Sequence, residues 1–450
     1  MNKSGSNALI GDALIVSATG TELLSSVLPL SPRALRKAIF DAANPEHVAR
    51  SLPAQALYLL VRDAGVTSSL ELLALADEEQ FRTMLDLDLW RADELNEDCV
   101  WEWLALVEEQ DDFSVLQKVL KTIDLKLVGM ILASYVEVII FDDGNDQPPH
   151  AGFYTPDKGF TWLHVNIQDP DKHFLLTRFL ALIFETSREL FYQLLSISSV
   201  STRTSLEEDS YQERNKRLEA YGVPNTEFAH ELFAALPVAE LNKKLADEAL
   251  PFDLRVFDIR PVPILHHSVS SLEPLDAVFR AALSGVEEEF TLLANAMLVL
   301  FKIDFSDRDA VERLTKQLLG AINLGLERGV EGHPSTDAIE LVKRVGLRPF
   351  AQCGMTLLLS LRKKALNLSA EQIKQIDPQT GEFLVIAGAR EYPPLIPDAW
   401  QSNGSFEIIN GRIERDYRAF QHSSEYTSVF AFIEAELLKP ELLKPELLKP

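Results

Sequence analysis

The chain has 450 residues, of which 46% are hydrophobic and 25% are charged, the composition of a folded protein rather than a disordered one. Its 43 lysines and arginines oppose 68 aspartates and glutamates, and the formal net charge of −25 argues against nucleic acid as the main partner. Cys99 and Cys353 lie far apart, so they indicate neither a disulfide framework nor a thiolate metal site. These features fit the reducing cytoplasm.

The sequence lacks the usual signals of a secreted or membrane protein. Asp12 interrupts the apolar run near the amino terminus, and no convincing cleavage site follows it. The longest apolar run without a charge, residues 290–301, has twelve residues, whereas a span across a bilayer needs roughly twenty. We therefore expect no membrane insertion.

Short segments with helical periodicity, separated by turn-forming residues, occupy the amino-terminal part of the chain. Apolar side chains recur at helical spacing, for example at Leu57, Leu60 and Val61. None of the segments is long enough to be stable alone, so they must pack on one another. The predicted fold class is mainly α, with stacked helical hairpins in an α-solenoid-like or multi-helical arrangement. The expected helices cover residues 31–42, 53–64, 68–76, 78–85, 93–109 and 113–121.

One segment departs from this helical pattern. Residues 136–141, VEVIIF, are rich in β-branched side chains and are followed by turn-forming residues. Two further extended segments follow, at 152–154 and 160–167. The pattern predicts a small β-hairpin or meander near residues 136–167.

Helices are expected to resume after this element, beginning with a long apolar helix from residue 169 to about residue 197. The last fifteen residues repeat Glu-Leu-Leu-Lys-Pro three times, and a proline at every fifth position prevents a continuous helix. The expected organisation is a flexible amino terminus (1–20), a helical array (21–135), a small β element (136–168), a central helical domain (169–378), a mixed region (379–435) and a low-complexity tail (436–450).

The central region contains a charged helix with ionisable groups in a regular pattern. Glu207, Tyr211 and Arg214 recur at steps of four and three residues, which places them along one stripe of the helix, and Arg217 follows Arg214 by three residues. These four residues form our candidate ligand site, in which the arginines would hold a small anion. The alternative is a structural network in which the arginines neutralise internal carboxylates.

A corner is predicted where this charged helix stops. The helix should end at Gly222, because glycine readily adopts the left-handed conformation, and Pro224 prevents its continuation. Asn225 and Thr226 then supply a side-chain cap for a second helix that begins near Glu227.

Acidic residues are concentrated in residues 71–112, where fifteen aspartates and glutamates accompany two arginines. A solvated helix surface is the simplest explanation, and a docking face for a basic partner is the alternative. We expect Asp86 and Asp88 to cap helices or to lie in a solvated loop, rather than to act as paired carboxylates. Trp101 is expected to pack in the core, with an exposed aromatic recognition site as the alternative.

The sequence contains no phosphate-binding glycine loop, no dinucleotide-binding glycine triplet and no nucleophile elbow. His230 and Glu231 begin a zinc-protease pattern, but Ala234 occupies the position of the second histidine. His266 and His267 are adjacent in an extended segment, so their side chains should point to opposite sides. We expect no metal and no cofactor, and we assign no catalytic residue.

The charged helix and its corner carry the pattern Leu-Glu-Glu-x-x-Tyr-x-x-Arg-x-x-Arg-Leu-x-x-x-Gly-[Phe/Val]-Pro between residues 206 and 224. This pattern resembles a motif of a bacterial protein family of unknown function, although Ser210 and Val223 stand where alanine and phenylalanine are commoner. Residues 79–90 (EQFRTMLDLDLW), 323–327 (NLGLE) and 347–354 (LRPFAQCG) are also similar to that family. The resemblance covers residues 21–390 and implies a mostly helical protein without assigning an activity.

Two functional hypotheses follow. The first is a cytoplasmic, non-enzymatic scaffold or regulatory protein that binds another protein through a helical surface. The second is an enzyme or a small-anion-binding protein whose site gathers Glu207, Tyr211, Arg214 and Arg217.

Overall fold

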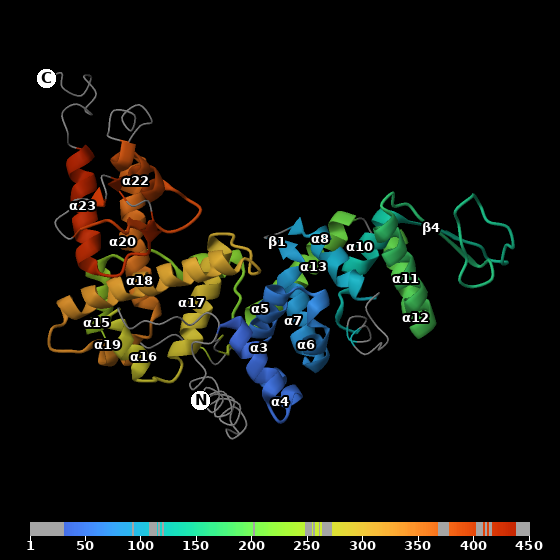
Figure 1. Cartoon of the computed structure of the whole chain (residues 1–450), viewed down its shortest axis with the longest axis horizontal. Helices are drawn as coiled ribbons and strands as arrows, with labels where there is room; N and C mark the ends of the chain where they lie inside the picture. The colour runs from blue at the N-terminus through green and yellow to red at the C-terminus, as the bar shows by residue number, and fades with distance from the viewer. Residues whose placement is uncertain are drawn as a thin grey trace, which may run out of the picture. The chain divides into compact units, whose positions relative to one another are not determined.

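The computed structural model describes residues 31–91, 94–107, 115, 118, 121–200, 203–247, 254, 257–260, 262, 272–367, 378–401, 408–409, 412–413 and 416–437. Most of these residues are helical, and the described strands form only two-stranded antiparallel sheets (Figure 1). The predicted mainly α fold with a small β element is confirmed. The chain divides into two compact units, Met1–Leu218 (unit 1) and Glu219–Pro450 (unit 2), and this division lies inside the segment 169–378 that the sequence pattern groups together.

Unit 1 is built from short helices and two small hairpins. Its elements in chain order are α3 (Pro32–Asp41), α4 (Pro45–Ser51), α5 (Ala54–Ala64), α6 (Leu70–Leu75), α7 (Glu78–Asp88), β1 (Trp90–Arg91), β2 (Glu94–Leu95), α8 (Glu97–Leu104), α10 (Leu125–Tyr135), β3 (Val136–Ile140), β4 (Thr161–Val165), α11 (Pro170–Thr186), α12 (Arg188–Val200) and α13 (Arg203–Ala220).

Helix α7 begins at a capping box. The Asp77 side chain accepts a hydrogen bond from the Gln80 backbone N–H at 2.7 Å, and the Gln80 side chain accepts one from the Asp77 N–H at 3.0 Å. The Gln80 amide also donates to the carbonyl oxygens of Ala49 and Leu52, at 3.0 and 2.8 Å. The Gln80 side chain therefore caps the start of α7 and also binds the end of α4.

The structure corrects three boundaries in this unit. Helix α7 continues to Asp88, beyond the expected end at residue 85, because its last turn is buried on all sides. Residues 93–109 do not form one helix, since the β1–β2 hairpin precedes α8. The expected helix from 169 to 197 is two helices, α11 and α12, because Ser187 is extended and its hydroxyl accepts a hydrogen bond from the Leu190 N–H at 3.2 Å.

Strands β3 and β4 form the predicted hairpin. They pair antiparallel with Val136 opposite Val165 and Ile140 opposite Thr161. Tyr154 pairs with Leu163 on β4, so the loop between the strands folds back on the hairpin. In Figure 1 this loop lies at the edge of unit 1, beyond the helices.

Unit 2 contains longer helices. Its elements are α14 (Thr226–Leu232), α15 (Val238–Ala246), α16 (Leu275–Arg280), α17 (Val286–Leu300), α18 (Arg308–Gly332), α19 (Ala338–Val345), α20 (Arg348–Leu366), α22 (Pro378–Gly388), β5 (Ile396–Pro397), β6 (Ile408–Ile409), β7 (Arg412–Ile413), β8 (Tyr417–Arg418) and α23 (Ser423–Leu437).

Glycines allow α18 and α20 to cross at close range. A Cβ atom on Gly354 would collide with the backbone carbonyl of Ala321, and one on Gly325 would collide with that of Phe350. Gly325 belongs to the NLGLE stretch and Gly354 ends the LRPFAQCG stretch. The two stretches that resemble the family thus meet at this crossing. Their backbones approach so closely there that neither glycine has room for a side chain.

The predicted corner after the charged helix is confirmed. Helix α13 ends at Ala220, Gly222 has a φ of 81°, and the Asn225 side chain accepts a hydrogen bond from the Phe228 N–H at 2.9 Å to cap α14. The Asn295 amide donates to the Gly222 carbonyl at 2.9 Å. The Asn225 cap and the buried Asn295 amide therefore both stabilise the turn between α13 and α14.

Other predicted features lie outside the described residues. These are the amino terminus 1–20, most of the expected helix 113–121, the extended segment with His266 and His267, and the tail from residue 438 onward. Within the described part of the chain, no helix combines the length and the hydropathy that crossing a bilayer requires.

Candidate functional site

The four predicted site residues lie on α13 but differ in burial and in their partners. Arg214 is buried, with 9% of its surface exposed, whereas the Arg217 side chain is 30% exposed. The Tyr211 ring lies 5.5 Å from the ring of Trp90, beside the end of α7. Glu207 accepts a hydrogen bond at 3.5 Å from the N–H of Leu95, the residue of β2 that pairs with Trp90.

Asp86, in the last turn of α7, binds both arginines. Arg217 Nε lies 2.7 Å from Asp86 Oδ2, and Arg217 Nη2 lies 2.8 Å from Asp86 Oδ1. This is the bidentate geometry in which the planar guanidinium and the carboxylate match each other. Arg214 Nε donates to the backbone carbonyl of Asp86 at 2.7 Å.

Aromatic rings enclose the guanidinium of Arg214. Its central carbon lies 5.9 Å from the ring centroid of Trp90 and 5.9 Å from that of Tyr211. Its Nη1 donates to Asn215 Oδ1 at 2.9 Å. Cation–π contacts and hydrogen bonds together compensate for the cost of burying this charge.

A second network surrounds Asp88, two residues along the same helix. Tyr58 Oη donates to Asp88 Oδ1 at 3.0 Å, and Trp103 Nε1 donates to Asp88 Oδ2 at 2.6 Å. Arg62 Nε lies 3.2 Å from Asp88 Oδ1, and Arg62 Nη1 donates to Glu102 at 2.7 Å. The Asp88 side chain is therefore fully engaged by α5 and α8.

The helical geometry of α7 separates the two networks. Two residues along an α-helix correspond to a rotation of about 200°, so Asp86 faces α13 while Asp88 faces α5 and α8. Asp86 is 7% exposed and Asp88 is 4% exposed. The expectation that these aspartates cap helices or lie in a solvated loop is wrong, because both are buried ion-pair partners inside a helix.

Burial and charge act against each other in this network. Burial raises the pKa of Asp86, and the hydrogen bonds from Arg217 oppose that rise. Burial likewise raises the pKa of Asp88, and the positive charge of Arg62 opposes it. Burial lowers the pKa of Arg214 to about 10, whereas the hydrogen bond to Asp86 raises the pKa of Arg217. Both α13 arginines therefore stay cationic at neutral pH.

This arrangement links helices that are distant in the chain. Through Asp86 and Asp88, α7 is bound to α13 on one side and to α5 and α8 on the other. The arginine donors that point at Asp86 are used internally. An external anion at this position would have to displace the Asp86 carboxylate.

The tryptophans of the acidic region belong to the core, as predicted for Trp101. Trp90, Trp101 and Trp103 are 5%, 7% and 4% exposed. Trp103 also packs edge-to-face on Phe81, with ring centroids 5.4 Å apart. Trp103 binds Asp88, Trp90 lies beside Arg214 and Trp101 packs on Tyr135, so these buried rings do not form an exposed recognition surface.

The histidines near the hairpin make aromatic contacts. The His164 ring stacks on Phe153 at 5.2 Å and 28°, and His164 Nδ1 lies 3.9 Å from a Glu137 oxygen. His150 also lies beside Phe153, at 6.2 Å between ring centroids. Among the described residues, no three His, Cys, Asp or Glu side chains are grouped so that they could hold a metal ion.

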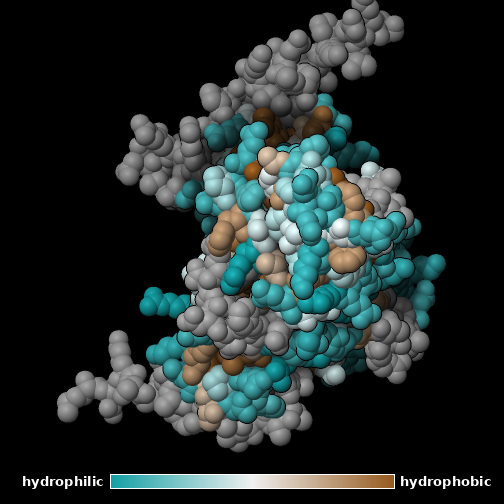
Figure 2. Space-filling view, turned by 90° about the vertical axis from the view of Figure 1, so that its right-hand side faces the viewer, coloured by the Kyte–Doolittle hydropathy of each residue, from teal (hydrophilic) through white to brown (hydrophobic). Residues whose placement is uncertain are grey.

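Large apolar side chains are exposed on the β3–β4 hairpin and the two helices that follow it. We call Ile140, Phe160, Phe174 and Tyr192 the hairpin surface, and they are 64%, 50%, 53% and 41% exposed. Figure 2 views the molecule from this side and shows apolar side chains separated by hydrophilic ones. The sequence pattern predicted the hairpin but not this exposure, because alternation along a short strand does not show whether another element covers it.

Comparison with known proteins identifies the family of the chain. No curated protein and no solved structure shows a significant match. The model of the Family of unknown function (DUF6178) matches residues 17–388, which include the α7–α13 network and the α18–α20 crossing. The predicted membership of an uncharacterised family is confirmed: the chain belongs to DUF6178, a family of unknown function.

Proposed function

We propose that this protein is a cytoplasmic, non-enzymatic scaffold or regulatory protein that binds a basic protein partner through the hairpin surface. The observation that carries this proposal is the exposure of Ile140 and Phe160, at 64% and 50%, at the loop end of one small hairpin. The hydrogen bond from the Phe141 N–H to the Phe160 carbonyl brings Ile140 and Phe160 to the same end of the hairpin, and exposed apolar patches of this kind mark interaction sites.

The charge of the hairpin favours a basic partner. Between residues 136 and 165 the chain carries five acidic residues and one lysine, Lys158. Asp157, in the loop, accepts a hydrogen bond from Tyr192 Oη at 2.8 Å, so an acidic group lies beside an exposed ring. A partner with an apolar patch rimmed by lysine or arginine would complement this surface.

The exposed acidic residues of segment 71–112 provide a second candidate docking face on the same unit. Glu71, Glu78 and Asp98 are exposed, whereas Asp86 and Asp88 are withdrawn into the buried networks. We rank this face below the hairpin surface, because solvated acidic side chains on helices are common without any partner.

The alternative proposal is an enzyme or a small-anion-binding protein with its site at Glu207, Tyr211, Arg214 and Arg217. It would require an anion to compete with Asp86 for Arg217, which is held by two hydrogen bonds of 2.7 and 2.8 Å. It would also require Glu207 to give up the hydrogen bond that its carboxylate accepts from the Leu95 N–H. We therefore favour the scaffold.

A comparative pull-down tests the scaffold proposal. The affinity-tagged full chain and the combined variant Ile140→Ser with Phe160→Ser are incubated with lysate of the source cells at low and moderate salt. The matched control combines Leu359→Ser with Val385→Ser, which replaces two apolar side chains of unit 2 that are 39% and 57% exposed. Quantitative mass spectrometry compares the bound proteins, and direct titration then measures the affinity of each purified candidate.

We expect one basic protein to bind the wild type and the control but not the hairpin variant, with an affinity that falls as salt increases. Recovery of no partner above background at either salt concentration contradicts the scaffold proposal. Equal binding of the partner by the hairpin variant contradicts the assignment of the surface.

A further inference from the structure

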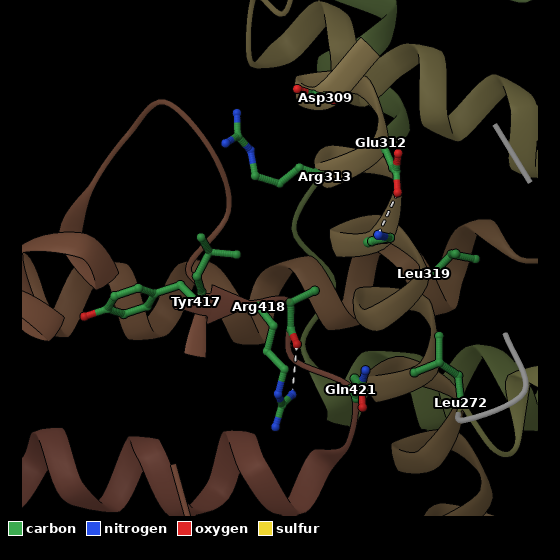
Figure 3. Close-up of a pocket in the computed structure, with 11 residues that line it drawn as sticks. Leu272, Asp309, Glu312, Arg313, Leu319, Tyr417, Arg418 and Gln421 are labelled. Carbon is green, nitrogen blue, oxygen red and sulfur yellow. Dashed lines mark hydrogen bonds and ion pairs between the residues drawn. The ribbon is translucent and has the colours of Figure 1, made fainter. Parts of the chain in front are cut away.

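Unit 2 contains a pocket of about 470 Å³, which lies between α18, β8 and the segment that follows β8 (Figure 3). Pockets that bind small organic molecules typically have volumes of roughly 300–1,000 Å³. This pocket belongs to unit 2 alone and shares no residue with the networks around Asp86 and Asp88.

One part of the pocket wall is apolar. Leu319 of α18, Leu272 and Leu395 line it, and they are 3%, 6% and 6% exposed. The backbone framework around them is closely packed, because a Cβ on Gly320 would collide with the Phe420 carbonyl. The leucines therefore offer a fixed surface against which the apolar body of a ligand can pack.

Two of the three cations that line the pocket are neutralised by carboxylates. Lys316 lies 2.8 Å from Glu312, one turn away on α18. Arg418 lies 2.7 Å from Glu425 and 3.5 Å from Asp398. Because these carboxylates already balance the charges of Lys316 and Arg418, neither cation attracts a ligand anion strongly.

Arg313 differs from the other two cations. Its guanidinium lies 6.0 Å from the ring centroid of Tyr392, and no carboxylate of the described residues forms an ion pair with it. Figure 3 shows its side chain extending from α18 toward the upper left of the view, above Tyr417, whereas the Arg418 side chain extends downward. Asp309, one turn before Arg313, lies in the first turn of α18, where the helix dipole stabilises its charge.

We propose that this pocket binds a small organic acid, with the carboxylate held by Arg313 and an apolar body packed against Leu319, Leu272 and Leu395. The planar guanidinium presents paired N–H donors that match the two oxygens of a carboxylate. A phosphate group fits less well, because Asp309 lines the same pocket and repels its second negative charge.

Binding of four probes to the full chain, measured by calorimetry and by saturation-transfer NMR, tests this proposal. The probes are 3-phenylpropionate, its neutral amide, the cation 3-phenylpropylamine, and inorganic phosphate. The protein variants are Arg313→Gln, the conservative Arg313→Lys, and the control Arg260→Gln. Arg260 is an exposed arginine of unit 2 that does not line the pocket.

We expect saturable binding of 3-phenylpropionate that is about tenfold or more weaker in Arg313→Gln, partly restored in Arg313→Lys and unchanged in Arg260→Gln. The amide, the amine and phosphate should bind the wild type more weakly than the acid. Because Arg313 is exposed, its replacement should leave the circular dichroism spectrum unchanged. The proposal is overturned if no probe binds saturably, if the amide or phosphate binds as tightly as the acid, or if Arg313→Gln binds the acid like the wild type.

Discussion

Arg217 and Asp86 are 131 residues apart in sequence, yet they form a two-point ion pair with nitrogen–oxygen distances of 2.7 and 2.8 Å. The pair joins α13 to the end of α7, and Arg214 reinforces the link through the Asp86 carbonyl. The charged helix looks like a ligand site in the sequence, but in the structure its arginines bind α7 and stabilise unit 1.

The first prediction concerns this ion pair. Asp86→Ala should destabilise unit 1 by about 3–5 kcal/mol, because it removes the carboxylate that pairs with Arg217 and the negative charge that lies near the buried Arg214. The double variant with Arg217→Ala should lose less than the sum of the two single variants. Urea unfolding followed by tryptophan fluorescence reports on unit 1, since it contains four of the five tryptophans: Trp90, Trp101, Trp103 and Trp162.

An exposed ion pair of the same unit provides the control. Lys121 and Glu78 lie 3.0 Å apart and their side chains are 63% and 59% exposed, so Glu78→Ala should change stability by less than about 1 kcal/mol. If Asp86→Ala is no more destabilising than Glu78→Ala, the pair does not hold the two helices together.

The second prediction concerns the crossing of α18 and α20. Gly354→Ala should destabilise unit 2 by at least ~2 kcal/mol, because the added methyl group meets the rigid backbone carbonyl of Ala321. Gly388→Ala is the matched control, since its methyl group would lie 3.4 Å from the flexible Leu366 side chain. Hydrogen exchange of the α18 and α20 amides should accelerate in the first variant only. If the α18 and α20 amides exchange at the same rate in both variants, the close approach at Gly354 does not contribute to the stability of unit 2.

The third prediction concerns the pH dependence of unit 2. Burial opposes the ionisation of Glu425, but hydrogen bonds from Arg418 and from the backbone N–H groups of Gln421 and His422 outweigh it and lower the pKa of Glu425. A carboxyl whose pKa is lower in the folded state stabilises the fold above its unfolded pKa, and this contribution is lost as the pH falls toward the folded pKa.

Glu425→Gln should therefore destabilise the start of α23 at neutral pH, and its difference from the wild type should shrink as the pH falls below the unfolded value of about 4.3. Hydrogen exchange of α23 amides across this range measures the difference. A difference that is constant with pH would show that Glu425 contributes through packing and not through its charge.

The fourth prediction concerns the two thiols. Burial, aided by the negative charge of Asp88, raises the pKa of Cys99 to about 11, and burial raises the pKa of Cys353 to about 11. Iodoacetamide should alkylate neither thiol rapidly in the native protein at neutral pH, because both are buried and the thiolate is scarce.

In increasing urea, Cys99 should become reactive as unit 1 unfolds and Cys353 as unit 2 unfolds, which peptide mass spectrometry can follow separately. Rapid labelling of either cysteine without denaturant would contradict the burial shown here.

Features of the fold whose physical cause is local lie where the sequence pattern predicts them. The corner at Gly222 and the cap at Asn225 depend on residues only a few positions apart, and each strand of the β3–β4 hairpin has its own local β-branched or aromatic pattern, so all three lie where the sequence predicts. The break at Ser187, where a single polar residue divides an otherwise continuous apolar segment into two helices, does not follow from the pattern.

By itself, the sequence determined the mainly helical fold class, the family resemblance and the position of the charged helix, because periodicity and capping are properties of neighbouring residues. Only the tertiary structure decided that Asp86 and Asp88 are buried, that Asp86 binds Arg217, and that Arg313 faces a pocket. The environment of a charged side chain depends on which distant helix packs against it, and sequence spacing alone does not contain that information.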